Sequence, residues 1–145
     1  MRGFLMSAAA VAVVFGAVLA GQTKIASNED YSAVMKSNAQ NMGTTNKSIG
    51  SGAFADAKTS LATVRQNFMA LQTYWTEKKQ DNAVMIVKDG LSRIDVLDKL
   101  LSATPVDQMA AMAQAKMVQG ACGACHQAYR EGDAQTGFRF KAGVN

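Results

Sequence analysis

The sequence has little of several residue types on which functional sites are commonly built. It contains one proline, one histidine and two cysteines, and aromatic residues make up only 7% of its 145 residues. The scarcity of proline, beside abundant alanine, leucine, methionine, lysine and glutamine, favours one helical domain. The net charge is +4, but no basic run or stripe is present, so nucleic acid is a poor candidate partner. Since there is a single histidine and no cluster of carboxylates, acid–base catalysis has few groups to use, and an enzyme is not expected.

The two cysteines and the only histidine lie together near the C-terminus. Cys122, Cys125 and His126 form the pattern C-x-x-C-H, which attaches a c-type haem. On a helix these residues stand at i, i+3 and i+4, so their side chains share one face. Both thiols can then add to haem vinyl groups while the imidazole reaches the iron, and the small Gly123 and Ala124 let the macrocycle approach. The motif predicts one covalent haem c, anchored by the two cysteines, with His126 as proximal axial ligand.

Three other interpretations of the cysteine pair are weaker. A redox dithiol of this spacing usually accompanies a βαβ pattern, and none is visible in the sequence. A closed zinc site needs four ligands, whereas this chain offers three plausible ones. A disulfide within the motif would leave the adjacent histidine unexplained. Haem attachment is therefore the favoured interpretation.

The N-terminus has the pattern of an export signal. Arg2 is followed by an alanine-rich apolar segment at 8–19 and by small residues that offer a cleavage site after Ala20. We therefore expect a signal peptide at 1–20 and a mature periplasmic domain at 21–145. An uncleaved membrane anchor is the alternative, because the uncharged run is long enough to span a bilayer. Export also suits c-type haem, which is attached outside the cytoplasmic membrane.

Apolar residues at steps of three and four predict four amphipathic helices. Their expected ranges are about 28–49, 54 to the charged stretch 77–81, about 82–101, and 105 to about 130. Ser27 is the expected N-cap of the first helix, and Thr104 and Pro105 are the expected N-cap and first residue of the last. Gly90, within the third helix, marks either a close helix approach or a local break.

The second helix has the most regular apolar seam, typical of a bundle core: Phe54, Ala57, Leu61, Val64, Phe68, Leu71 and Trp75. Short connections between the helices imply antiparallel neighbours. We therefore expect an all-α, antiparallel four-helix bundle with haem covalently bound between its helices. No strand is expected, and the sequence assigns no role to the tail at 132–145.

From about Glu29 to Arg130 the chain resembles the class II c-type cytochromes, the cytochrome c′ family. These are four-helix bundles with C-x-x-C-H near the C-terminus, often followed by an aromatic residue and an arginine, as Tyr129 and Arg130 follow here. High-spin members leave the iron five-coordinate, whereas low-spin members supply a methionine from the first helix. The resemblance implies Met35 as the distal axial ligand, because it stands at the matching position and the arginine–glutamine pair of high-spin members is absent. Met42 shares the same helix face, so the choice between the two rests on the resemblance, and either can simply be a core methionine.

The resemblance implies an exported electron carrier whose haem iron is ligated by His126 and Met35, with redox proteins of an electron-transport chain as partners. The alternative is a five-coordinate haem protein that binds a small gas such as nitric oxide. Homodimers are frequent in the family, and no feature of the sequence decides between monomer and dimer.

Overall fold

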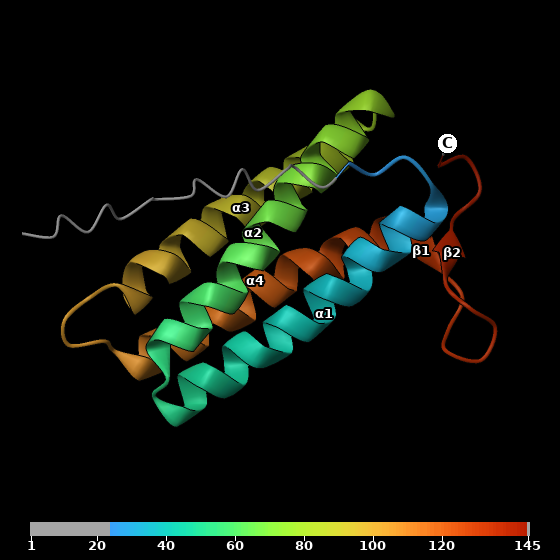
Figure 1. Ribbon diagram of the computed structural model, residues 1–145. Coiled ribbons are helices and arrows are strands. Elements are labelled where there is room, and N and C mark those ends of the chain that lie inside the picture. The colour runs from blue at the N-terminus through green and yellow to red at the C-terminus, as the bar shows by residue number, and fades with distance from the viewer. Residues whose placement is uncertain (1–23, 145) are drawn as a thin grey trace, which may run out of the picture.

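A computed structural model describes residues 24–144 and shows a bundle of four helices with a small hairpin after the last one (Figure 1). Successive helices run in opposite directions and pack against each other, and the first also packs against the fourth. The elements are α1 (Asn28–Ser51), α2 (Phe54–Glu77), α3 (Asp81–Leu101), α4 (Gln108–Tyr129), β1 (Arg130–Glu131) and β2 (Arg139–Phe140). The expected helical bundle is confirmed.

The expected signal peptide at 1–20 lies outside the described residues. In the part of the chain that the structure describes, no helix is both long and apolar enough to cross a membrane.

The start of α1 matches the sequence, whereas the start of α4 does not. Ser27 accepts a hydrogen bond from the backbone of Asp30, whose carboxylate accepts the amide of Ser27 in return, so a complete capping box begins α1. The predicted N-cap at Thr104 was wrong. Asp107 caps α4 instead, because its carboxylate accepts the amide of Ala110 at 2.9 Å. Thr104 and Pro105 lie in the connection before the helix.

The seam predicted for α2 forms the centre of the core. Leu61, Val64 and Trp75 are each at most 1% exposed, as expected from their spacing. Gly90 does not interrupt α3; a Cβ at this position would collide with the ring of Phe68 on α2. Of the two interpretations of this glycine, a close approach between helices is therefore the correct one.

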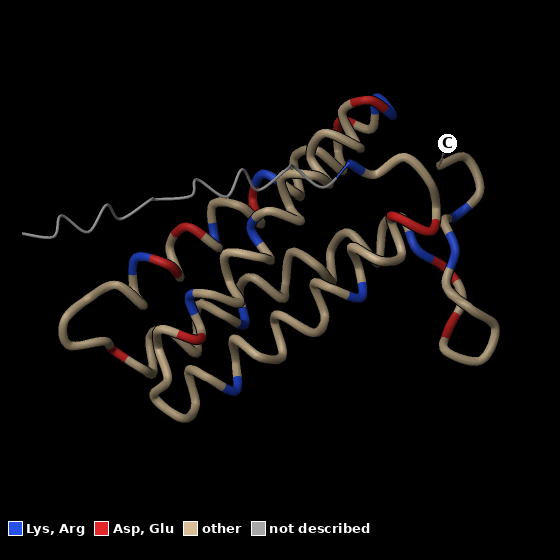
Figure 2. The backbone as a smooth tube through the Cα atoms, viewed as in Figure 1, with Lys and Arg blue, Asp and Glu red and all other residues tan. Residues whose placement is uncertain are grey.

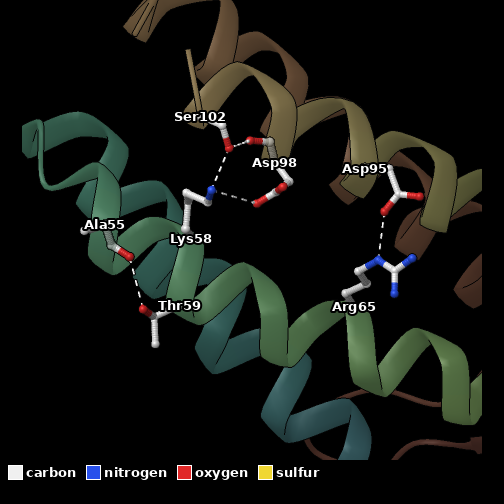
Figure 3. Close-up of polar contacts among 7 residues, drawn as sticks. All are labelled: Ala55, Lys58, Thr59, Arg65, Asp95, Asp98 and Ser102. Carbon is white, nitrogen blue, oxygen red and sulfur yellow. Dashed lines mark hydrogen bonds and ion pairs between the residues drawn. The ribbon is translucent and has the colours of Figure 1, made fainter. Parts of the chain in front are cut away.

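Polar contacts on the surface connect α2 to α3 (Figure 3). Arg65 Nε lies 2.8 Å from Asp95 Oδ1, and Lys58 Nζ donates to the hydroxyl of Ser102 at 2.6 Å and lies 3.7 Å from Asp98. These side chains are 40–50% exposed, and exposed ion pairs contribute about 0–1 kcal/mol. The apolar seams, rather than these ion pairs, hold the helices together.

The tail, to which the sequence assigned no role, folds back onto the end of the bundle. Its two short strands pair antiparallel, with Arg130 opposite Phe140, a ladder that was not expected. The ring centroid of Phe140 lies 4.8 Å from that of Tyr31 and 5.6 Å from that of Trp75, both in edge-to-face arrangements. Such pairs add to the stability gained by burial. The hairpin is thus anchored beside the start of α1 (Figure 1).

Candidate haem site

A cavity of about 320 Å³ opens between the helices, in the half of the bundle that contains the C-terminal part of α4. Each of the four helices contributes to its walls, and most of the side chains are apolar. Those from the other helices include Ala39 of α1, Phe68 and Leu71 of α2, and Ile86 and Val87 of α3. A volume within roughly 300–1,000 Å³ and apolar walls with few polar groups are typical of small-molecule and cofactor sites.

The motif residues line this cavity from α4. Cys122, Cys125 and His126 lie on continuous helix at i, i+3 and i+4, and all three are partly buried cavity residues. Both cysteines are free thiols. The helix therefore presents the two thiols and the imidazole to one apolar space, as the spacing requires.

Burial shifts the pKa of both thiols and of the imidazole toward their neutral forms. It raises the pKa of Cys122, and burial together with Cys122 raises the pKa of Cys125 to about 11. A redox dithiol needs a lowered thiol pKa, so the surroundings do not favour that interpretation. Burial, together with nearby Arg130, lowers the pKa of His126, which favours the neutral imidazole that binds metals.

Two methionines of α1 also line the cavity. Met35 is partly buried and Met42 is 4% exposed. Met35 also lines a second cavity that contains His126, whereas Met42 lines only the first of these two. The structure thus places Met35 next to both spaces bordered by the imidazole.

Sequence reasoning missed a buried polar contact at the cavity wall. Asn38 lies between the two methionines on α1, is 6% exposed, and accepts a hydrogen bond from Asn67 Nδ2 of α2 at 3.0 Å. The same nitrogen of Asn67 lies 3.0 Å from the hydroxyl of Ser37. The signal in the sequence was an asparagine on the inward face of α1, where an apolar residue is the ordinary choice.

The residues of the cavity fit a haem. A flat apolar macrocycle requires apolar walls, two thiols within reach of its vinyl groups, and a neutral nitrogen ligand for the iron. Within residues 24–144, no group of three or more cysteine, histidine, aspartate or glutamate residues is arranged to hold a metal ion by itself. A haem does not need such a group, because the macrocycle supplies four of the iron ligands. No protein-family model, curated protein or solved structure matched the chain.

Proposed function

We propose that this protein is an exported monohaem c-type cytochrome that carries electrons. The observation that supports this most strongly is the cavity, because both thiols, the only imidazole of the chain and a methionine of α1 line one apolar space. Haem c would supply one-electron chemistry through the ferrous and ferric states of its iron.

Four side chains would hold the haem, two as covalent anchors and two as ligands of the iron. The thiols of Cys122 and Cys125 would anchor the haem through two thioether bonds, each formed by adding S–H across one vinyl double bond. His126 would be one protein ligand of the iron, and Met35 is the proposed second one. Methionine–histidine ligation raises the reduction potential, and the walls of the cavity are mostly apolar. These features suit a carrier that accepts and passes on electrons without binding a substrate.

Export is part of the proposal. The leader at 1–20 would be removed after Ala20, and the mature domain would meet its redox partners in the periplasm. N-terminal sequencing of protein from the soluble periplasmic fraction should give Gly21 as the first residue. Recovery of an intact Met1 terminus from the membrane fraction would instead identify the leader as an anchor.

A second candidate, a five-coordinate haem that binds a small gas, is favoured by one observation. The carbonyl oxygen of Asn38 is engaged by Asn67, so the amide nitrogen of Asn38 is a potential donor at the cavity wall. Such a donor stabilises a polar diatomic molecule on the iron.

The absorption spectrum of the ferric protein distinguishes the two candidates. The electron carrier predicts a six-coordinate low-spin spectrum in both oxidation states and slow or negligible binding of carbon monoxide. A five-coordinate high-spin spectrum with rapid carbon monoxide binding would instead support the gas-binding protein.

A further inference from the structure

A second cavity, of about 480 Å³, adjoins the first at the end of the bundle that the hairpin covers. The two cavities share Met35, Ala39, Cys125 and His126, so they meet beside the imidazole and the proposed sixth ligand. Their walls differ in character. The first is almost entirely apolar, whereas the second combines aromatic rings with basic side chains.

The charges that line the second cavity have one sign. Lys36 reaches it from α1, and Arg130 and Arg139 reach it from the two strands of the hairpin; among the described residues that line it, none is an aspartate or a glutamate. Figure 2 shows both basic and acidic residues along the hairpin, beside the acidic start of α1. The guanidinium of Arg130 lies over the ring of Phe138, 4.1 Å from its centroid. Three cationic side chains that line one space favour an anionic occupant.

Glu131 and Tyr31 are two other ionisable residues near the second cavity. Glu131 accepts a hydrogen bond from Arg139 Nε at 2.9 Å, which uses one of the five N–H donors of the guanidinium. Burial, followed by nearby Cys125, raises the pKa of Tyr31, so its hydroxyl stays neutral and can donate. Glu131 offsets one of the three positive charges and the neutral Tyr31 offsets none, so an excess of positive charge remains.

The hairpin holds its two arginines in place. Phe140 is fixed among Tyr31, Tyr74 and Trp75. The backbone amide of Lys141 donates to the carbonyl of Tyr129 at 3.0 Å, continuing the pairing of the strands. The basic wall is therefore formed by ordered structure and belongs to the fold.

We infer that Arg139, together with Arg130 and Lys36, forms the binding site for the two propionate carboxylates of the haem, and that the hairpin closes this edge of the site. The inference rests on the proposed function. A haem is apolar over its macrocycle and doubly anionic at one edge, and the two adjoining cavities have the same division. A carboxylate that leaves bulk water needs a charged or hydrogen-bonding partner, and the basic wall provides one.

Arg139→Ala tests the inference, with Arg65→Ala as a matched control. Both changes remove an exposed arginine that bonds an acidic side chain through Nε, at 2.9 Å and 2.8 Å, but Arg65 lies on α2, outside both cavities. The measurement is a pH titration of the haem propionates by nuclear magnetic resonance. Loss of a neighbouring cation raises a carboxyl pKa by about 1–3 units. We expect Arg139→Ala to raise the propionate pKa by about 1 unit, the low end of this range, because this arginine is 63% exposed. Arg65→Ala should leave the propionate pKa unchanged, and Arg139→Lys should restore the parent value.

The inference is overturned if the haem propionates have the same pKa in Arg139→Ala and Arg65→Ala while the parent carries covalent haem. In that case the proposed function stands and only the role of the hairpin fails. If the parent carries no covalent haem, the function and the inference fall together. Because removal of a cation also favours the ferric state, the reduction potential of Arg139→Ala should fall relative to the control. An unchanged potential would count against the inference as well.

Discussion

The two ends of the bundle have the same helical periodicity but are filled differently. At the end where α1 meets α2, side chains close the core completely: Ile94, Leu97 and Ala111 have no exposed surface. Gln108 adds two hydrogen bonds to the last carbonyls of α1, at 2.7 and 2.9 Å. Toward the other end, the same helices line two adjoining cavities. We call these regions the closed end and the cavity end.

The two ends differ because the inward-facing residues of α4 change along the helix. On α4 the buried positions Ala111, Ala115 and Val118 complete the closed end, whereas the positions that follow are Cys122 and Cys125, which line a cavity. Native cores rarely contain large voids. A cavity whose walls include the only thiols and the only imidazole of the chain supports the proposal that a haem occupies it.

The largest expected effect concerns Met35, which lines both cavities together with His126. Met35→Ala should convert the spectrum from low to high spin and lower the reduction potential, because the iron loses a thioether ligand. Carbon monoxide should then bind much faster than it binds the parent. Met42→Ala is the matched control, since it truncates a methionine of the same helix face and cavity, and it should keep the low-spin spectrum. The reverse pattern would move the ligand two helical turns along α1.

A substitution at the closed end should lower the stability of the protein and leave its absorption spectrum unchanged. Leu97→Ala removes a side chain with no exposed surface and should lower the free energy of unfolding by about 2–5 kcal/mol. Val96→Ala, on the same helix at a position 42% exposed, should change it by roughly 0.5 kcal/mol or less. Chemical denaturation measures both. A change of spin state in Leu97→Ala would show that the two ends are not independent.

Gly90 tests how tightly α3 approaches the cavity wall. A Cβ there would collide with Phe68, which lines the cavity. Gly90→Ala should therefore lower the free energy of unfolding by about 1–3 kcal/mol. Gly43→Ala is the control, because a Cβ at this helical position meets no atom within 4 Å and should stabilise by roughly 0.5–1 kcal/mol. Equal stabilisation by both changes would contradict the close approach.

The smallest expected effect is a pH dependence of the capping box at the start of α1, at the cavity end. Hydrogen bonds from Ala26 and Ser27 lower the pKa of Asp30 in the folded protein. The contribution of the Asp30 carboxylate to the stability of the folded protein is therefore complete above the ordinary carboxyl pKa of 3.8. It is lost as the pH falls through the lowered pKa. The protection of the Ala26 and Ser27 amides, measured as the ratio of intrinsic to observed exchange rate, should then fall at low pH. In Asp30→Asn this protection should no longer depend on pH; if it still does, another group is responsible.

Much of the fold could be predicted from the sequence, because its signals are local. The capping box at Ser27 and the seam of α2 depend on neighbours three and four residues away. The start of α4 was misplaced because Thr104 and Asp107 are both good caps, and the sequence does not show which one the chain uses.

The cavity and the hairpin depend on contacts that no local pattern encodes. The motif predicted that Cys122, Cys125 and His126 share a helix face, but the space before them depends on four helices meeting. The packing of Phe140 on Tyr31 joins residues more than a hundred positions apart. The basic cavity could not be predicted for the same reason, since Lys36 and Arg139 meet it only in the folded chain.

The most direct test of the central claim is the mass of the intact mature protein under denaturing conditions, after expression with the haem-attachment machinery of the periplasm. The account predicts the polypeptide plus one haem, and a bare polypeptide for the double variant Cys122→Ala, Cys125→Ala. A parent protein with the mass of the polypeptide alone, and with both thiols open to alkylation once it is unfolded, would contradict the account.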